Sequence, residues 1–283
     1  MPELPEVETV KRGLEPAMLG AKFTQVELRR ANLRYPFPSG FVEGLEGRRV
    51  ETLTRRAKYI CIHLDNQTVL IIHLGMSGRV TITGQAVGEF HNEAGKQSKH
   101  DHVMFEMDNG HRVFYNDARR FGFMDLIGAQ DLEICRHFKG MGIEPLGNEL
   151  NSNTLIKLFK GKSAPLKAAL LDQRLVCGLG NIYVCEALYR AGLSPFAAAG
   201  SINAQQAEIL TCEIRLVLEE ALLAGGSSLR DYAHTDGSLG YFQHGFKVYD
   251  REGAGCSNAY CGGLIQRKAQ SGRSTFFCGE CQA

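Results

Sequence analysis

The 283-residue sequence predicts an α+β protein of two domains, in which an N-terminal antiparallel β-sandwich with a flanking helix precedes a helical domain. Two changes of pattern support this order. Short runs rich in β-branched and aromatic residues continue to about residue 130, and apolar residues at helical spacing follow them. The last segment carries four closely spaced cysteines, which are typical of a small metal-bound hairpin. With 44% hydrophobic residues, the chain has enough apolar material for two cores.

The first element is a helix, because apolar residues recur at helical spacing from Val7 to Met18 and Gly20 follows as a stop signal. Strands follow it, since turn signals such as Asn109-Gly110 separate the β-rich runs. This arrangement is typical of an antiparallel sandwich or barrel. The expected strands span Lys22 to Arg30, Arg49 to Thr54, Tyr59 to Leu64, Thr68 to Leu74, Arg79 to Thr83, His102 to Met107, Arg112 to Tyr115 and Phe121 to Ile127.

The second half of the sequence predicts helices and then a long loop. The longest helix has Asn203 as a plausible N-cap and Gly225-Gly226 beyond its end. Residues 226–245 are rich in Gly, Ser, Asp and His without periodicity, and loops of that length are usually functional or disordered. The expected helices span Thr154 to Phe159, Leu166 to Leu171, Ile182 to Arg190 and Ala204 to Leu223.

The net charge of +1 conceals a local excess of basic residues. Between residues 29 and 58 there are eight basic and three acidic side chains. Such an excess suits a polyanion, and a solvated edge of basic strands explains it equally well. The basic residues are Arg29, Arg30, Arg34, Arg48, Arg49, Arg55, Arg56 and Lys58, and the acidic ones are Glu43, Glu46 and Glu51.

The sequence lacks the usual membrane and export signals. No run approaches about 18 uninterrupted apolar residues, and the start lacks a basic-then-apolar export pattern. We therefore expect a soluble cytoplasmic protein with no membrane partner.

Five cysteines lie in apolar stretches without the regular spacing of disulfide pairs, and we expect them to be buried free thiols in a reducing compartment. They are Cys61, Cys135, Cys177, Cys185 and Cys212.

The other four cysteines have the spacing of a structural zinc site. Cys256-x4-Cys261 and Cys278-x2-Cys281 are separated by sixteen residues, which is the length of one hairpin. Four thiolates would close a tetrahedral site and fold a segment that is too small for its own core. Disulfides are the alternative. The basic stretch from Gln266 to Thr275, at the expected hairpin turn, fits either nucleic-acid contact or a solvated turn.

Position two could carry a nucleophile. Removal of Met1 would leave Pro2 with a free secondary amine, and an amine at a chain end can form Schiff bases with electrophilic carbons. With Met1 in place the same nitrogen is an amide, so this chemistry requires that Met1 be removed. The alternative is that Pro2 only sets the backbone ahead of the first helix.

Six features of the chain, each weak alone, are specific in combination. They are Pro2-Glu3-Leu4-Pro5-Glu6, Lys58 after Arg55-Arg56-Ala57, His73-Leu74-Gly75-Met76-Ser77-Gly78, Asp117-Ala118-Arg119-Arg120-Phe121-Gly122, Gly178-Leu179-Gly180-Asn181-Ile182-Tyr183 and the four terminal cysteines. Together they resemble the bacterial formamidopyrimidine-DNA glycosylases, which are also called 8-oxoguanine DNA glycosylases. The resemblance covers nearly the whole chain.

The resemblance implies a base-excision repair enzyme that removes oxidised purines from duplex DNA and nicks the strand as an AP lyase. By resemblance, Pro2 attacks C1′ of a flipped nucleotide, and the resulting Schiff base permits β and then δ elimination. Glu3 has the general acid role, Lys58 is a second proton donor, and Arg273 donates a proton or contacts phosphate during δ elimination. The alternatives are a first-turn acid for Glu3 and solvated bases for the other two.

The resemblance also implies DNA contacts. Met76, Arg119 and Phe121 match the side chains that fill the space left by the flipped base, as an apolar wedge and a guanidinium for the orphaned cytosine. On sequence alone, Met76 and Phe121 would more often be core residues. Asn181 opens a helix and would offer its amide to a phosphate. The remaining implied DNA contacts are His100, Lys162 and Lys167.

The resemblance divides the chain into a catalytic sandwich domain (1–130), a linker (131–152), a helix-two-turn-helix domain (153–245) and a zinc finger (246–283). Within the third part, the 227–241 loop matches the segment that closes over the flipped purine. We expect one structural Zn²⁺, double-stranded DNA with oxidised bases as the partner, a monomer, and a bacterial cytoplasmic protein that works at the nucleoid.

Two departures from the family pattern are visible. Ala118 stands where proline is common, and the first cysteine pair is two residues wider than usual.

Two other functions also fit the sequence. One is an endonuclease VIII-like glycosylase for oxidised pyrimidines, against which Leu4 and the 227–241 loop argue. The other is a noncatalytic zinc-containing DNA-binding protein, in which Pro2 and Glu3 would only punctuate a helix.

Overall fold

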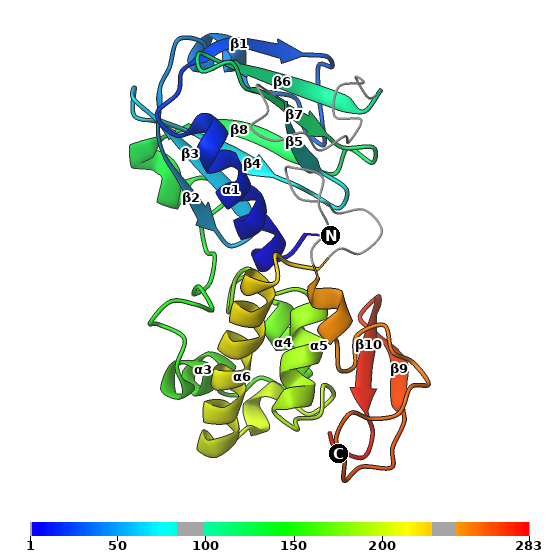
Figure 1. Ribbon diagram of the computed structural model, residues 1–283. Coiled ribbons are helices and arrows are strands. Elements are labelled where there is room, and N and C mark those ends of the chain that lie inside the picture. The colour runs from blue at the N-terminus through cyan, green and yellow to red at the C-terminus, as the bar shows by residue number, and fades with distance from the viewer. Residues whose placement is uncertain (1, 84–98, 228–240, 283) are drawn as a thin grey trace. The chain divides into compact units, whose positions relative to one another are not determined.

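The computed structural model describes residues 2–83, 99–227 and 241–282. The chain forms two compact units, shown in Figure 1. The sandwich unit comprises Met1–Lys139 and Ala224–Tyr241, and the helical unit comprises Gly140–Leu223 and Phe242–Ala283. The finer division at residues 130, 152 and 245 stays a prediction.

The sandwich unit contains two four-stranded antiparallel sheets, with strand orders β1-β6-β7-β5 and β2-β3-β4-β8. The antiparallel sandwich expected from the alternating runs is therefore confirmed. The strands are β1 (Phe23–Leu28), β2 (Val50–Arg56), β3 (Tyr59–Leu64), β4 (Thr68–His73), β5 (Arg79–Thr83), β6 (Asp101–Met107), β7 (Arg112–Asn116) and β8 (Phe123–Gly128).

Both sheets contribute to one apolar core. Strands β3 and β4 lie in the centre of their sheet and are buried at most positions, which explains their nearly continuous apolar sequences. In the other sheet, Phe23 and Phe105 pack edge to face with their ring centroids 5.4 Å apart. This core gives the loops at the strand ends a rigid support.

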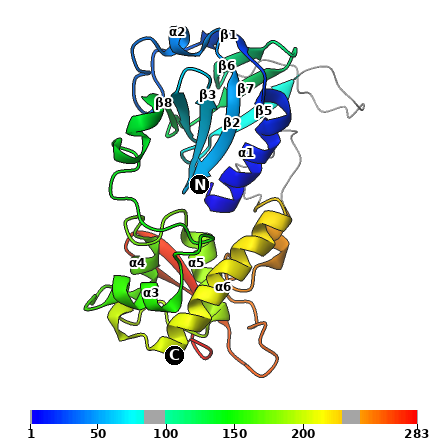
Figure 2. The same ribbon diagram turned by 90° about the vertical axis from the view of Figure 1, so that its left-hand side faces the viewer.

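Helix α1 (Leu4–Met18) packs against β2, β3 and β5 (Figure 2). Its start is fixed by a capping box, in which the Glu3 side chain accepts the Glu6 backbone N–H and the Glu6 side chain accepts the Glu3 backbone N–H. The apolar positions Val7 and Leu14 are fully buried, as the helical spacing predicted. The chain leaves the helix at Gly20, whose φ of 76° favours glycine.

The helical unit is organised around α6 (Ala204–Leu223), which packs against α3 (Ser152–Phe159) and α5 (Asn181–Arg190). Asn203 caps α6 as predicted, because its Oδ1 accepts the Gln206 N–H at 2.9 Å. The fourth helix is α4 (Leu166–Leu171), which packs against α5.

The C-terminal hairpin consists of β9 (Ile265–Gln270) and β10 (Arg273–Cys278). Its two-residue turn is Ser271-Gly272, with φ values of 50° and 76°, which matches the twist of a tight hairpin. The expectation that the whole basic stretch from Gln266 to Thr275 lies at the turn was wrong, because most of it forms the two strands. Arg273 is the first residue after the turn.

The structure adds short elements that the sequence did not predict, and they are too brief to show periodicity. They are α2 (Phe41–Leu45) and the 3₁₀ turns η1 (Ala129–Ile134), η2 (Ala199–Ser201) and η3 (Phe242–Gly245).

The expectation of five buried thiols was wrong for two cysteines. Cys212 is exposed on α6 and Cys135 is half-buried, since an apolar neighbourhood in sequence does not specify which helix face a residue occupies.

Candidate functional site

The start of the chain is buried and held by one carboxylate. Pro2 and Glu3 are both buried at the beginning of α1. Glu6 Oε2 accepts the Glu3 backbone N–H at 2.8 Å, and Glu6 Oε1 accepts the Ser227 backbone N–H at 2.8 Å and its hydroxyl at 3.0 Å. The Glu6 carboxylate therefore joins Glu3, near the start of the chain, to Ser227.

Ser227 marks the beginning of the predicted 227–241 loop. Residues 228–240 lie outside the described part of the chain, so the expectation of a loop that closes over the flipped purine rests on the sequence. The two ends of the segment lie side by side, because Ser227 and Tyr241 form an antiparallel bridge. The Tyr241 backbone N–H also donates to the Ala224 carbonyl at 3.1 Å.

Lys58 lies in the turn between β2 and β3, next to Ala57, whose φ of 51° is unusual for a residue with a side chain. Lys58 is 7% exposed. The Arg55 guanidinium donates to the Ala57 carbonyl at 2.9 Å and to Glu8 Oε2 at 3.2 Å. Because Glu8 belongs to α1, this ion pair ties the turn that carries Lys58 to the helix that Glu3 caps.

His73 lies at the end of β4 and is paired in register with Tyr59, the residue after Lys58. Burial, with smaller contributions from the positive charges of Lys58 and Arg34, lowers the pKa of His73 to about 4. The imidazole is therefore neutral at pH 7. Its Nδ1 accepts the Gly75 backbone N–H at 3.1 Å and so shapes the loop that carries Met76. No individual role was expected for His73 from the sequence.

Two apolar side chains project from adjacent loops. Met76 is 36% exposed and Phe121 is 42% exposed, so neither is a core residue. Arg119 is also exposed, and its guanidinium carbon lies 4.9 Å from the centre of the Phe121 ring, a cation–π contact. The two loops approach closely at Gly75, where a Cβ would lie 2.3 Å from the Gly122 nitrogen. The structure thus brings Met76, Arg119 and Phe121 together.

Asp117 is fully buried and binds both of these loops. Its Oδ1 accepts the Ser77 hydroxyl at 2.6 Å, and its Oδ2 accepts the Gly122 backbone N–H at 2.8 Å. The Ser77 oxygen in turn accepts the Arg119 backbone N–H at 3.2 Å. The half-buried His100 joins the same group through its backbone, because its carbonyl accepts the Asp117 N–H at 3.1 Å. Sequence reasoning gave Asp117 no role, since a carboxylate that binds loop amides has no distinctive spacing.

The helical unit brings three predicted residues to the start of β10. Asn181 Nδ2 donates to the Ser274 carbonyl at 2.9 Å, and the Lys167 ammonium donates to the same carbonyl at 3.0 Å. Lys167 also donates to the Thr275 hydroxyl at 2.8 Å. Arg273, immediately before Ser274, is exposed. Asn181 and Lys167 thus fix the strand that carries Arg273.

We predicted a direct DNA contact for Lys167, and the structure instead places its side chain 1% exposed and bound to β10. A cavity of about 230 Å³ lies beside it, between Lys167, Asp172 and Arg273. Lys162 lies half-buried after α3, and its backbone carbonyl accepts the Gly200 N–H at 2.9 Å. Arg174, with a smaller contribution from Lys162, holds the pKa of Asp172 below its usual range.

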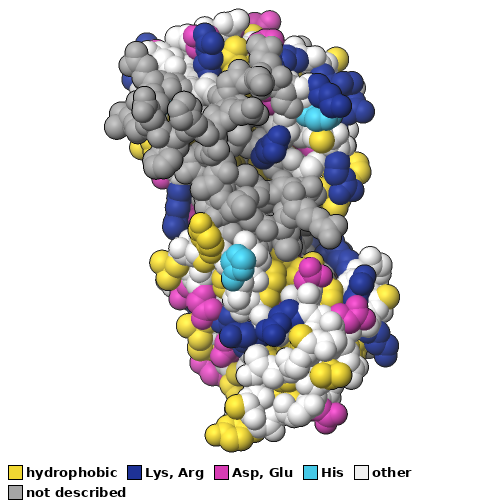
Figure 3. Space-filling view, turned by 45° about the vertical axis from the view of Figure 1, so that its right-hand side comes forward, with side chains coloured by type: hydrophobic (Ala, Val, Ile, Leu, Met, Phe, Trp, Pro, Cys, Tyr) yellow, Lys and Arg dark blue, Asp and Glu magenta, His cyan; other side chains and the backbone are white. Residues whose placement is uncertain are grey.

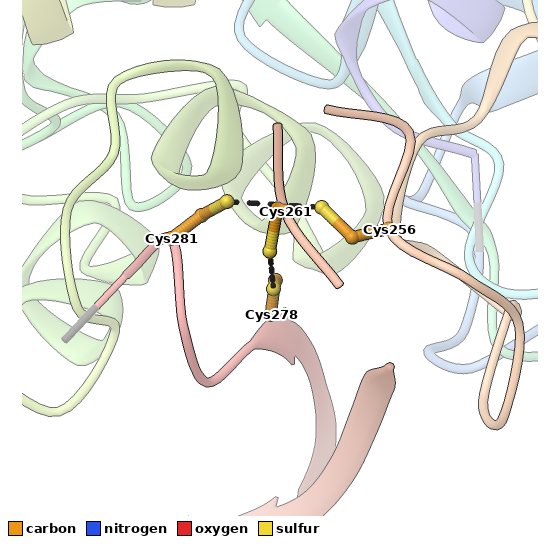
Figure 4. A group of neighbouring side chains, drawn as sticks. All are labelled: Cys256, Cys261, Cys278 and Cys281. Atoms are coloured by element: carbon orange, nitrogen blue, oxygen red, sulfur yellow. Dashed lines mark hydrogen bonds between the residues drawn. The ribbon is translucent and has the colours of Figure 1, made fainter. Parts of the chain in front are cut away.

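The four terminal cysteines form one group, and their sulfur atoms point toward one another (Figure 4). All four sulfurs lie within 4.8 Å of one another. Cys256 Sγ and Cys281 Sγ are 3.7 Å apart, and Cys261 Sγ and Cys278 Sγ are 3.6 Å apart. Sulfur ligands of a tetrahedral zinc ion are about 3.8 Å apart, as zinc–sulfur bonds of about 2.3 Å require, whereas a disulfide needs about 2.0 Å. The donor set therefore fits a closed four-thiolate metal site.

The face drawn in Figure 3 carries several Lys and Arg side chains. In the sequence, the excess of basic residues lies between positions 29 and 58. Among the described residues, no helix is long and apolar enough to cross a membrane.

Comparison with known proteins identifies the family. The family model described as "Formamidopyrimidine-DNA glycosylase N-terminal domain" matches residues 1–124, and that described as "Formamidopyrimidine-DNA glycosylase H2TH domain" matches residues 141–233. A formamidopyrimidine-DNA glycosylase of Methylobacterium nodulans is 58% identical over 294 aligned positions, covering 100% of this chain and 99% of its own.

Solved structures agree with this result. Lactococcus lactis Fpg (MutM) in a complex with N7-benzyl-Fapy-dG DNA is similar with 32% identity and a TM-score of 0.87, covering 99% of each chain. MutM in complex with carbocyclic 8-oxo-G DNA is similar with 32% identity and a TM-score of 0.87, covering 99% of each chain. The chain belongs to the formamidopyrimidine-DNA glycosylase family.

Proposed function

We propose that this protein is a base-excision repair enzyme that removes 8-oxoguanine and formamidopyrimidines from duplex DNA and then cleaves the strand at the abasic site. The observation that carries the proposal is the buried start of α1, where Pro2 and Glu3 are adjacent and the Glu6 carboxylate fixes the backbone. Membership of the family and the DNA complexes of its relatives give the substrate class.

The reaction begins with an amine. After Met1 is removed, the Pro2 nitrogen gives up its proton as it attacks C1′ of a nucleotide that has been flipped from the duplex, and the bond from C1′ to the damaged base breaks as the departing base takes up a proton. Glu3 supplies the proton that opens the sugar ring, because its carboxyl group lies one residue from the amine. The product is an iminium that joins Pro2 to the sugar.

Strand cleavage uses the same intermediate. The iminium acidifies the C2′ proton, and loss of that proton expels the 3′ phosphate in a β elimination. A second elimination expels the 5′ phosphate. We assign Lys58 as a proton donor in these steps, because it is buried in a turn tied to α1 by the pair between Arg55 and Glu8. Arg273 donates a proton or binds a phosphate during the second elimination.

The exposed group of Met76, Arg119 and Phe121 suits the space that a flipped base leaves. The apolar side chains offset part of the unstacking cost, which is roughly a few kcal/mol per step. The Arg119 guanidinium supplies planar donors for the cytosine that has lost its partner. His100, Lys162 and Asn181 are assigned to the DNA backbone, and Lys167 acts by fixing β10 beneath Arg273.

The four cysteines are assigned to one structural zinc ion. When bound, the ion would fold the hairpin and contribute no open coordination position to the chemistry. The residues Cys256, Cys261, Cys278 and Cys281 would hold it, as their mutual distances and all-thiol donor set allow. A bacterial enzyme with this substrate would work as a monomer at the nucleoid, in the cytoplasm.

Product analysis tests the proposal. Duplexes that carry 8-oxoguanine, a formamidopyrimidine or an oxidised pyrimidine are incubated with the processed enzyme, and the DNA ends are identified by mass. We expect excision of the two oxidised purines with phosphates on both sides of a one-nucleotide gap. Preferential excision of the pyrimidine lesion would favour the endonuclease VIII-like reading, and binding without cleavage would favour the noncatalytic one.

A further inference from the structure

Tyr189, which lies outside the four-cysteine group, contacts it directly. Tyr189 belongs to the last turn of α5, and its hydroxyl oxygen lies 3.1 Å from Cys256 Sγ and 3.0 Å from the Ser257 hydroxyl oxygen. Two further donors reach sulfur atoms from the hairpin segment itself. Asn258 Nδ2 lies 3.5 Å from Cys281 Sγ, and the Gly263 backbone nitrogen lies 3.4 Å from Cys261 Sγ.

The chemistry of a bound thiolate fixes the direction of the first contact. A cysteine that binds a metal has lost its proton, so its sulfur can only accept hydrogen bonds. The Tyr189 hydroxyl must then donate to Cys256 Sγ, and the Ser257 hydroxyl donates to the Tyr189 oxygen. The three groups form a short chain of hydrogen bonds, which orients the hydroxyl hydrogen of Tyr189 toward the thiolate.

Helix α5 holds Tyr189 in position. The helix is buried along most of its length, and Cys185 packs in the same apolar cluster as Ile265 and Phe276 of the hairpin. One turn before Tyr189, the fully buried Glu186 accepts the backbone N–H groups of Lys247, Val248 and Tyr249 at distances from 2.8 to 3.1 Å. The donor to Cys256 therefore comes from a rigid helix. Asn258, in contrast, lies in the loop between Cys256 and Cys261, and Gly263 lies just after Cys261.

We propose that Tyr189 is a positioning residue for the metal site and determines how tightly the four cysteines retain their ion. This inference rests on the proposed zinc site. Four thiolates around one divalent ion leave a net charge of −2, and donors to the sulfurs stabilise that charge. Loss of such an outer hydrogen bond usually weakens metal binding by about 10-fold to 100-fold.

The test compares Tyr189→Phe with Tyr260→Phe in the full-length protein. The first change removes only the hydroxyl that donates to Cys256. The second removes the hydroxyl of Tyr260, which is fully exposed and lies between Cys256 and Cys261 in the sequence. Zinc affinity is measured by competition with a chromophoric chelator. We expect about 10-fold weaker zinc binding in Tyr189→Phe and unchanged binding in Tyr260→Phe. Equal affinities in Tyr189→Phe and the wild type would overturn the inference, whereas a wild type that binds no zinc would refute the proposed metal site itself.

Two further measurements separate a hydrogen bond from a general loosening of α5. Cobalt(II) in place of zinc should show a shift of the thiolate-to-metal charge-transfer band in Tyr189→Phe, because the charge on Cys256 changes. Ser257→Ala should weaken binding less than Tyr189→Phe, and the double variant should be no weaker than Tyr189→Phe, since the serine acts through the tyrosine. Additive losses with an unshifted band would show that Tyr189 acts only through packing.

Discussion

Glu6 fixes the start of the chain with both oxygens of one carboxylate. One oxygen holds the Glu3 backbone N–H and the other holds Ser227, and the side chain is 2% exposed. A nucleophile at Pro2 benefits from this arrangement, because an amine that attacks a single carbon atom must be held in one place. In the proposed reaction, the residue that positions the amine is therefore separate from the residues assigned to move protons.

Removal of the Glu6 carboxylate should damage both stability and reaction rate. Glu6→Ala leaves buried N–H groups of Glu3 and Ser227 without their acceptor, which should cost about 2 kcal/mol of unfolding free energy. The rate of the covalent step should also fall in single-turnover assays. Glu15→Ala is the matched control, since Glu15 lies on the same helix and pairs with Lys11 at the surface. Similar losses in the two variants would contradict a positioning role for Glu6.

The half-buried His73 predicts a pH dependence of stability. Its pKa is about 4 in the folded protein, compared with 6.5 as the ordinary value. The folded state thus binds the proton less readily than the unfolded state, so this contribution is complete above pH 6.5 and is lost as the pH falls toward 4. His73→Asn keeps an acceptor for Gly75 and removes the titration.

Urea unfolding between pH 7 and pH 4 measures this effect. The wild type should lose on the order of 3 kcal/mol more than His73→Asn over this range. The half-buried His63 on β3, replaced by asparagine, should change the pH dependence less. A pH dependence that is the same in the wild type and His73→Asn would show that the imidazole titrates normally.

At the level of elements, the loops at Gly75 and Phe121 depend on a close backbone approach. Gly75→Ala would place a Cβ 2.3 Å from backbone atoms of the neighbouring loop, at a φ of 61°. Gly110→Ala is a matched control, because its φ is 86° and nothing lies within 4 Å of the added carbon. Gly110→Ala should cost about 1 kcal/mol and Gly75→Ala at least about 3 kcal/mol. Equal unfolding free energies for the two variants would mean that the Gly75 loop relaxes freely.

Most elements could be predicted from the sequence because their apolar spacing is regular. Helix α6 has the predicted bounds, and the central strands β3 and β4 differ from prediction by at most one residue. Helix α2 and the two-residue hairpin turn could not be placed, since short elements carry no period and turn position depends on pairing. Burial of Cys212 was predicted wrongly, because the helix face that packs is decided by distant residues.

The candidate site was predictable only in part. The grouping of the four cysteines could be expected from residue type and spacing, whereas the role proposed for Pro2 depends on the family resemblance. The roles of Glu6 and Asp117 do not, because each carboxylate binds backbone N–H groups that come from other parts of the chain. Lys167 shows the same limit, since a residue that the resemblance assigns to DNA contact has its ammonium group bound to β10.

For the whole molecule, the metal site and the sandwich should be separable. Cys278→Ser should release zinc and abolish DNA binding, because the hairpin that carries Arg273 would lose its support. The sandwich unit should stay folded, since every buried residue of its core cluster lies between Val7 and Met124. Metal content, duplex binding and the β-sheet circular dichroism signal test these outcomes. Unchanged zinc content would refute the four-cysteine site.

Binding of the whole molecule to DNA should depend strongly on salt. Basic residues neutralise phosphates and release counterions, so duplex affinity should fall by roughly 100-fold or more between about 50 and 200 mM salt. Fluorescence anisotropy with a labelled duplex measures the slope. A flat response would count against a phosphate-binding surface.

Borohydride trapping tests the central claim most directly. The protein, shown by mass to begin at Pro2, is mixed with a duplex that contains 8-oxoguanine in the presence of borohydride, and the adduct is digested and sequenced. We predict a covalent protein–DNA adduct at the Pro2 nitrogen, because reduction fixes the iminium. A protein that excises the base but gives no adduct, or an adduct at a lysine, would contradict the account.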